Sequence, residues 1–361
     1  MKRFSIVAPA ALTLALCASP LAAFANGDGA YDVTVLVSDG VVHAPTIDSN
    51  LVNPWGIAFN PNGFVWIANN GTSTSTLYDG NGKASPPPPM EPLIVTFAAG
   101  NDTKPTGIVF NGTQDFKVGG QSAFFIFSSE SGVISAWAPG ANATVAQTMA
   151  TRAGAIYKGL ALAANGKQNL LYATDFHNRK IDVFDTAYAD ALGKLKCRFK
   201  ADVPRHFAPF GIQNINGDLF VSYAKQDEEG EDDVAGRGLG LVVVFDANGC
   251  LIRHFAGGWP LNAPWGMALA PASFGPFSNT LLIGNFGDGR INAFSLRTGA
   301  FVGTLQREHG RPIEIEGLWG LRFGNGILDQ PTGTLFFTAG PSDENHGIYG
   351  KIEPPAGRDD D

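Results

Sequence analysis

A glycine-centred motif recurs six times along this chain of 361 residues. Each copy has a glycine among apolar residues, then a turn and a second apolar run, as in NPWGIAFNPNGFVWIANNG from Asn53 to Gly71. The glycines lie 51 to 55 residues apart, at Gly56, Gly107, Gly159, Gly211, Gly266 and Gly320. A period of this length, with several short apolar runs in each repeat, is typical of the blades of a β-propeller.

The apolar runs within each repeat predict strands, because they are short, rich in Val, Ile, Phe and Tyr, and bounded by turn residues. A third run follows in every repeat, and a fourth in the first five, including LKCRFKAD at 195–202. The sixth repeat lacks its fourth run, and YDVTVLVSD, from Tyr31 to Asp39, can supply it by pairing with Gly347–Glu353. We therefore expect an all-β, six-bladed propeller of four-stranded blades over residues 26–353, with the last blade closed by the N-terminal strand so that no sheet edge stays open.

The two ends of the chain have a different character. Lys2 and Arg3 precede an apolar stretch that ends in Ala23-Phe24-Ala25, which predicts a secretory signal peptide over residues 1–25 and export to the periplasm or the exterior. Residues 354–361 are expected to be a short disordered tail. No later segment is long and apolar enough to span a bilayer, so we expect no membrane insertion.

The net negative charge of the chain limits the classes of molecule that it can be expected to bind. The formal charge is −8 and becomes −10 when Lys2 and Arg3 leave with the signal peptide. No basic cluster is visible in the sequence, so nucleic acid and anionic lipid are not expected as partners. We expect a monomer with a small-molecule or saccharide partner. There is no nucleotide or flavin signal, since GRGLG at 236–240 precedes a predicted strand instead of a helix.

Two cysteines remain in the exported chain, Cys197 and Cys250. Both fall on predicted outermost strands of neighbouring blades. These strands diverge toward the rim, so their Cα atoms are expected to lie farther apart than the ~7 Å that a disulfide can bridge. The sequence therefore predicts two free thiols.

A family resemblance supports the architecture. LYATDFHNRKIDVFD, from Leu171 to Asp185, resembles the NHL-type repeat of six-bladed propellers. Together with the blocks LVNPWGIAF, GLWGLRFGNG and FFTAGPSDENHGIYG, it makes the chain similar to a family of exported, mostly bacterial propellers of unknown function. The resemblance implies the fold and export, and it names no substrate.

The residues that precede the six glycines should meet at one end of the central channel. Four are aromatic and one is a lysine, which gives the predicted substrate-binding set of Trp55, Lys158, Phe210, Trp265 and Trp319. Such a set can form the floor of a pocket for an anionic or sugar-like ligand. The alternative is that the aromatic rings fill the axis as hydrophobic core.

Polar residues of the surrounding loops suggest a metal site at the same end. Oxygen ligands suit calcium and imidazole suits zinc, and the predicted ligands are Asn53, Asn69, Asp175, Asn285, Asp288 and Glu316. His177 and His346 are the predicted catalytic residues, as metal ligand or general base. These predictions describe a metal-assisted hydrolase or lyase acting on a small molecule or saccharide. The alternative is a non-catalytic propeller that binds a ligand or protein, and the acidic stretch at 225–238 is expected to be a solvated flap.

Overall fold

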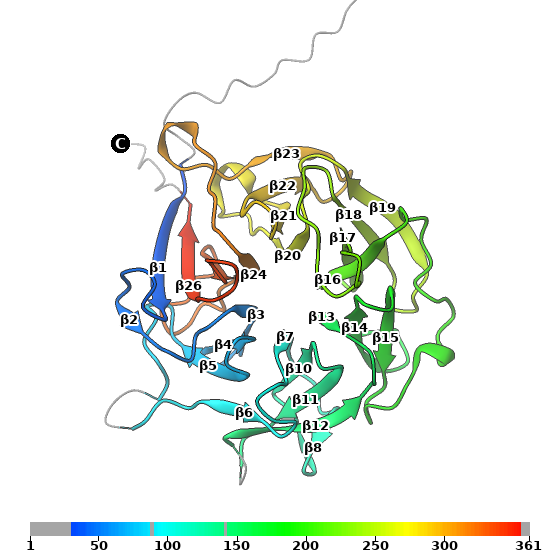
Figure 1. Cartoon of the computed structure of the whole chain (residues 1–361). Helices are drawn as coiled ribbons and strands as arrows, with labels where there is room; N and C mark the ends of the chain where they lie inside the picture. The colour runs from blue at the N-terminus through cyan, green and yellow to red at the C-terminus, as the bar shows by residue number, and fades with distance from the viewer. Residues whose placement is uncertain (1–29, 87–89, 141–142, 355–361) are drawn as a thin grey trace, which may run out of the picture.

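The computed structural model describes residues 30–86, 90–140 and 143–354. The predicted signal peptide and all of the predicted tail except Pro354 lie outside these residues. The described chain is all-β, with its sheets arranged around a central axis like the blades of a propeller (Figure 1). Its helices are three single turns of 3-10 helix, namely η1 (Leu192–Lys194), η2 (Gly275–Phe277) and η3 (Glu308–Gly310). None of the helices in the described ranges is long and apolar enough to cross a membrane.

Strands of equivalent position recur in each repeat. The innermost strands are β3 (Pro54–Phe59), β7 (Pro105–Phe110), β13 (Tyr157–Ala164), β16 (Phe207–Ile215), β20 (Pro264–Leu269) and β24 (Leu318–Phe323). The second strands are β4 (Val65–Asn69), β10 (Phe125–Ser129), β14 (Asn169–Asp175), β17 (Asp218–Lys225), β21 (Thr280–Asn285) and β25 (Leu335–Ala339). The third strands are β5 (Thr74–Tyr78), β11 (Val133–Trp137), β15 (Lys180–Phe184), β18 (Gly240–Phe245), β22 (Ile291–Ser295) and β26 (Ile348–Glu353). The outer strands are β1 (Asp32–Ser38), β6 (Val95–Phe97), β12 (Val145–Thr151), β19 (Leu251–Gly257) and β23 (Phe301–Thr304), and the short strands are β2 (Thr46–Ile47), β8 (Lys117–Val118) and β9 (Gln121–Ser122).

The hydrogen-bonded sheets are less uniform than predicted. Two of them have the expected four strands, β16–β19 and β20–β23. The first two repeats form one eight-stranded sheet, because their outer strands β6 and β12 pair in parallel. The third repeat has three strands, and the sheet of the last repeat has five because β2 adds to β1. The all-β propeller is confirmed, whereas the uniform set of four-stranded blades is wrong.

Glycines bring the innermost strands together around the axis. These strands contact one another in a closed ring, β3–β7–β13–β16–β20–β24 and back to β3. A Cβ atom added to Gly56 would lie 2.5 Å from the backbone oxygen of Thr106 in the next strand, and one on Gly320 would lie 2.6 Å from that of Trp55. The recurring glycine is therefore needed because the neighbouring backbone occupies the space of a side chain.

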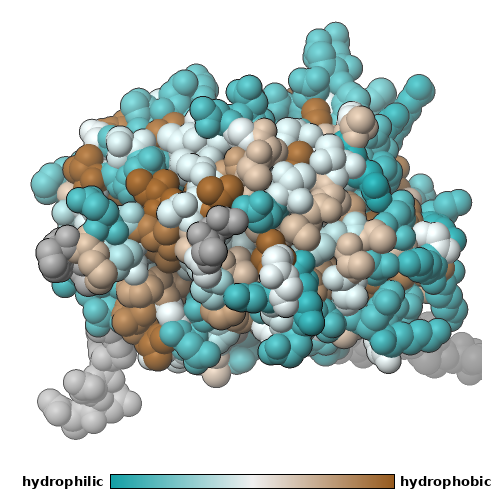
Figure 2. Space-filling model, turned by 90° about the horizontal axis from the view of Figure 1, so that it is seen from below, coloured by the Kyte–Doolittle hydropathy of each residue, from teal (hydrophilic) through white to brown (hydrophobic). Residues whose placement is uncertain are grey.

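The predicted closure of the ring is confirmed. β1 pairs antiparallel with β26, from Asp32 opposite Glu353 to Ser38 opposite Ile348. The N-terminal strand thus completes the sheet that contains the C-terminal strand, and the two lie side by side in Figure 1. On the rim seen in Figure 2, apolar residues lie in separate patches among hydrophilic ones.

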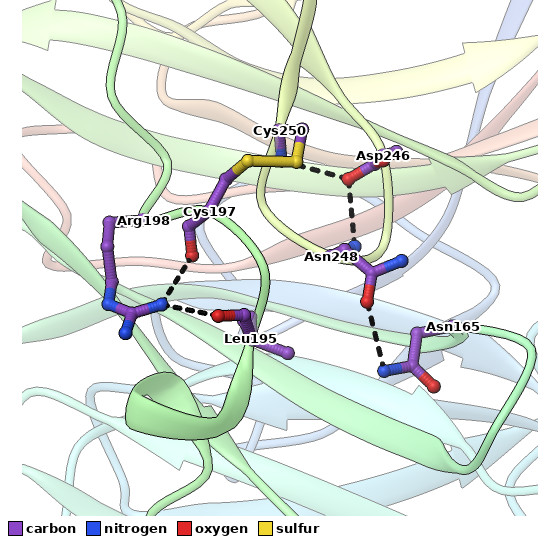
Figure 3. Close-up of a disulfide and its surroundings, with 7 residues drawn as sticks. All are labelled: Asn165, Leu195, Cys197, Arg198, Asp246, Asn248 and Cys250. Carbon is purple, nitrogen blue, oxygen red and sulfur yellow. Dashed lines mark hydrogen bonds between the residues drawn. A yellow bond between two sulfur atoms is a disulfide. The ribbon is translucent and has the colours of Figure 1, made fainter.

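Cys197 and Cys250 form a disulfide (Figure 3), so the prediction of two free thiols is wrong. Their Cα atoms are 4.9 Å apart. The predicted outer strand at 195–202 does not form. Instead, the backbone amides of Cys197 and Phe199 donate to the carbonyls of Asn248 and Gly249, in the turn between β18 and β19. This segment therefore crosses to the next repeat and brings the two cysteines together.

Candidate functional site

Lys158 lies at the centre of the face on which the innermost strands begin, which we call the lysine face. It is the second residue of β13 and only 1% of its surface is exposed. Its Nζ donates to Glu130 Oε1 at 2.5 Å and to Asp232 Oδ1 at 3.1 Å. Burial lowers the pKa of Lys158, but the attraction of Glu130 and Asp232 outweighs it, so the net pKa is raised and the lysine stays charged.

Aromatic rings surround the base of this lysine. Trp55 stacks on Trp319 with ring centroids 3.5 Å apart, and Lys158 Nζ lies 5.1 Å from the Trp55 ring. Trp265 Nε1 donates to the Lys158 carbonyl at 3.1 Å. The aromatic cluster comprises Trp55, Phe176, Phe210, Trp265 and Trp319, with Phe286 partly buried against it. The structure thus brings all five predicted substrate-binding residues together, and it buries them as the alternative interpretation expects.

Four carboxyl groups gather over the lysine, and we call Glu130, Asp232, Asp233 and Glu344 the carboxyl cluster. Asn70 Nδ2 donates to Glu130 Oε2 at 2.9 Å, and Asn53 Nδ2 donates to Glu344 Oε2 at 2.5 Å. Burial raises the pKa of Glu344, with the Asn53 hydrogen bond and the charge of Lys158 opposing it. Four carboxyl groups beside one ammonium group favour retention of a proton in the cluster.

Asp233 is the member of the carboxyl cluster whose pKa is raised most by its surroundings. Burial raises its pKa to about 7, and the charges of Glu344 and Asp232 add to the rise, whereas Lys158 opposes it. Its Oδ2 is buried and accepts no hydrogen bond from the described residues. A carboxyl group that titrates near neutrality can act as a general acid or base at physiological pH.

The acidic stretch at 225–238, here the acidic loop, connects β17 to β18. It was expected to be a solvated flap, but Asp232 reaches Lys158 from it. Gln226 fixes its base by donating to the carbonyl of Phe176 at 2.7 Å, and the Gly230 carbonyl lies 3.2 Å from His177 Nδ1. The loop therefore covers the lysine face. Sequence reasoning missed this role, because an acidic run between two strands does not show which neighbour it contacts.

The predicted catalytic histidines lie against other elements. The exposed His177 contacts the Gly230 carbonyl. His346 Nδ1 is 2.8 Å from Asp39 Oδ2, at the end of the closing strand β1. No contact of either imidazole with Lys158 or the carboxyl cluster is found among the described residues, so the structure does not gather these histidines into the site.

The predicted metal ligands lie in local hydrogen-bond networks. Most of their polar atoms are used in local hydrogen bonds: Asn69 Nδ2 donates to Thr74 and Thr76, Asn285 Nδ2 donates to Asp288, and Asn178, Ser342 and Trp319 donate to Asp175, Glu316 and Asn53, respectively. Asn69 Oδ1 is buried and has no hydrogen-bond partner among the described residues. In the part of the chain that the structure describes, no three His, Cys, Asp or Glu side chains are arranged to hold a metal ion. These residues instead stabilise the loops and turns of the lysine face.

Basic residues gather elsewhere, contrary to the expectation that the chain has no basic cluster. A surface cleft, here the basic cleft, is lined by Arg179, Lys180, Arg198, Lys200, Arg205 and His206. Lys180 is paired with Asp182 at 2.7 Å and the others come from the segment that follows the disulfide or from the turn before β15. The sequence did not show this cleft because two separated segments form it.

The amino-acid sequence resembles those of two uncharacterised viral proteins. No protein-family model matches the chain. It is 33% identical over 333 residues to uncharacterised protein R648 of Acanthamoeba polyphaga mimivirus, covering 89% of this chain and 80% of that protein. It is 32% identical over 336 residues to uncharacterised protein L690 of the same virus, covering 89% and 85%. Because these relatives are viral, they do not support the expected membership in a mostly bacterial family.

Two solved structures that align with this chain are dehydrogenases of low sequence identity. A glucose dehydrogenase aligns with a TM-score of 0.52 and 14% identity, over 89% of this chain and 98% of that one. The PQQ-bound aldose sugar dehydrogenase of Streptomyces coelicolor aligns with a TM-score of 0.50 and 14% identity, over 91% and 100%. At these identities the likeness shows the propeller fold alone.

Proposed function

The chain belongs to the family of the mimivirus proteins R648 and L690, and we propose that its lysine face binds a small molecule of the saccharide class. Asp233 is the acid or base of a hydrolase or lyase reaction there. The carrying observation is the Asp233 carboxyl group, with its pKa raised to about 7 and its Oδ2 buried without a partner beside Lys158. Aromatic rings below and carboxyl groups above suit a ligand that has both apolar ring faces and hydroxyl groups.

A ligand can reach Lys158 only if the acidic loop opens. The ion pair between Asp232 of this loop and Lys158 can be broken at little cost. The Asp232 side chain is 75% exposed, whereas that of Glu130 is 20% exposed. An exposed ion pair contributes little stability, so a ligand hydroxyl can replace Asp232 while Glu130 continues to neutralise Lys158. No step of this proposal passes through calcium, zinc or another metal.

We also propose that the propeller has six blades and that the protein is exported. Six innermost strands in one ring support a six-bladed propeller, in which the eight-stranded sheet counts as two blades joined at β6 and β12. The sequence of residues 1–25 and the Cys197–Cys250 disulfide support export, because disulfides persist in oxidising compartments. In this proposal residues 26–353 form the propeller and residues 354–361 are a tail.

A panel of neutral and acidic oligosaccharides, titrated calorimetrically into the protein and analysed for products, tests the proposal. We expect one class to bind and to be converted with a pH midpoint near 7. Asp233→Asn should abolish conversion, and Glu228→Gln, an exposed carboxyl change in the same loop, should leave it unaltered. A saccharide that converts equally in Asp233→Asn would contradict the role of Asp233, and the absence of binding by any saccharide would contradict the ligand class.

The second candidate is a non-catalytic ligand- or protein-binding propeller. It is favoured by the positions of His177 and His346 outside the carboxyl cluster. In the same experiment it predicts binding of a saccharide that is recovered unchanged.

A further inference from the structure

A cavity lies in the central channel at the ends of the innermost strands, opposite the lysine face. Its volume is about 420 Å³, within the range of small-molecule sites. Trp265, a member of the aromatic cluster, borders it at its inner end. The apolar side chains of its wall include Ile57, Ile108, Leu160, Ile212, Met267 and Leu321. Asn214, Asn216 and the backbone of the recurring glycines also line the cavity, so its wall has polar as well as aliphatic parts.

One cation lines this cavity, Arg322 in β24. It occupies the second position after the recurring glycine, where the other repeats carry Ala58, Val109, Ala161, Gln213 and Ala268. The two polar residues of this set, Gln213 and Arg322, both line the cavity. The sixth repeat therefore differs from the others in having a charged residue at this position, and this residue lies inside the channel.

The guanidinium group of Arg322 lacks a counter-charge in the described part of the chain. Among the described residues it makes no ion pair and no side-chain hydrogen bond, and burial lowers its pKa with no carboxylate opposing the effect. Lys158, the buried cation of the other face, is held by both Glu130 and Asp232. An arginine stays protonated in proteins, so the channel contains an uncompensated positive charge.

We propose that the central cavity binds a small organic carboxylate, with the carboxylate group on Arg322 and the hydrocarbon body against the aliphatic side chains of the wall. A guanidinium group matches a carboxylate through two parallel N–H···O bonds. The aliphatic side chains in the wall favour a ligand with a hydrocarbon part over an inorganic oxyanion. This site is separate from the lysine face and does not depend on the function proposed there.

Titration with hexanoate, hexanol and inorganic phosphate tests the site by calorimetry and thermal shift. Hexanoate should bind saturably and raise the Tm of the wild-type protein, as a ligand of the native state does. Hexanol, which lacks the charge, should bind at least about tenfold more weakly, since a charge-assisted hydrogen bond is worth that factor or more. Phosphate, which lacks the hydrocarbon, should also bind at least about tenfold more weakly, since burial of a few methylene groups is worth that factor.

Variants locate the binding. Arg322→Gln should weaken hexanoate binding at least about tenfold, the loss expected for a charge-assisted contact. Arg205→Gln, in the basic cleft, should bind hexanoate as the wild type does. If circular dichroism shows that Arg322→Gln does not fold, Arg322→Lys carries the test, since it keeps the charge and loses the paired donors. The proposal is overturned if hexanoate does not bind saturably, if it binds the folded Arg322 variants as tightly as the wild type, or if phosphate binds equally well.

Discussion

At the scale of single residues, the lysine face shows how a buried charge is accommodated. Lys158 is surrounded by aromatic rings, and Glu130 and Asp232 supply the opposite charge. Removing one partner of a buried pair leaves the other charge without compensation, which costs more than the pair itself contributes. The surroundings of Lys158 stabilise its charged form, whereas the burial of Asp233 and its acidic neighbours disfavour the ionised form of that carboxyl group.

Replacing Lys158 should therefore destabilise the fold through Glu130. Lys158→Met should lower the free energy of unfolding by about 3 kcal/mol, because Glu130 then lacks its counter-ion. Chemical denaturation measures this loss. Lys158→Met combined with Glu130→Gln should recover part of it, and equal losses for the single and double variants would contradict the coupling.

Asp233 should make stability fall as the pH rises. Its pKa is about 7 in the folded protein and 3.8 as the unperturbed value, so the folded state binds the proton more tightly. This contribution is fully present below pH ~4 and is lost as the pH rises through ~7. Asp233→Asn should remove this pH dependence and raise stability at pH 8 by up to about 4 kcal/mol, the equivalent of the shift in pKa. Denaturation curves from pH 4 to 8 for both proteins measure it, and parallel pH profiles would contradict the shift.

At the scale of elements, the innermost strands depend on backbone contact and the third repeat depends on a crossing segment. The glycine of each innermost strand abuts the backbone of the next strand, and Gly211 abuts the carbonyl of Trp265. After β15, the segment from 195 to 202 leaves its own repeat and is held by backbone hydrogen bonds and a disulfide to the β18–β19 turn. Both features join neighbouring repeats.

A methyl group at Gly211 should be costly. Gly211→Ala should lower the free energy of unfolding by about 3 kcal/mol, because the added Cβ has no room against backbone atoms that cannot move independently. Gly193→Ala is the matched control, since nothing lies within 4 Å of a Cβ built there. Thermal denaturation compares them, and equal Tm values for the two variants would contradict the argument.

The disulfide should stabilise the crossing segment. It links residues 53 apart in sequence, and loop-closure entropy for a loop of this size corresponds to about 4 kcal/mol as an upper value. The double change Cys197→Ser with Cys250→Ser should lower stability by 2–4 kcal/mol, roughly the range for native disulfides. Reduction of the wild type should have the same effect, and no change in Tm on reduction would be inconsistent with this role.

At the scale of the whole molecule, one strand closes the ring. β1 comes from the N-terminal end of the described chain and completes the sheet of β24, β25 and β26. Without it, β26 would present an unpaired edge. The first and last repeats would then be joined by contacts between their inner strands and by loop hydrogen bonds, such as that from the Gly80 amide to the Leu328 carbonyl.

Removal of residues 26–39 should therefore cost most of the stability. We expect the truncated protein to melt at a much lower temperature and to aggregate, because the edge of β26 is exposed. A synthetic peptide of residues 30–39 added in trans should restore part of the Tm. Cooperative melting of the truncated protein at an unchanged temperature would show that closure by β1 is not needed.

The sequence alone predicted the features that repeat. The glycine period, the apolar runs and the missing sixth outer run predict the propeller and its closure by β1, because each depends on local periodicity and on the need to pair every strand. The same register placed Trp55, Lys158 and Trp319 at one end of the channel. These positions follow from the repeat whatever the loops do.

Only the tertiary structure decided the features that depart from the repeat. Asp232 and Asp233 reach the lysine face on a long loop, and Cys197 meets Cys250 because its segment leaves its own sheet. Glu130 meets Lys158, whereas His346 pairs with Asp39. Loop paths and charge pairs are set by non-local packing and by the desolvation of each charged group, and neither has a period that a sequence can display.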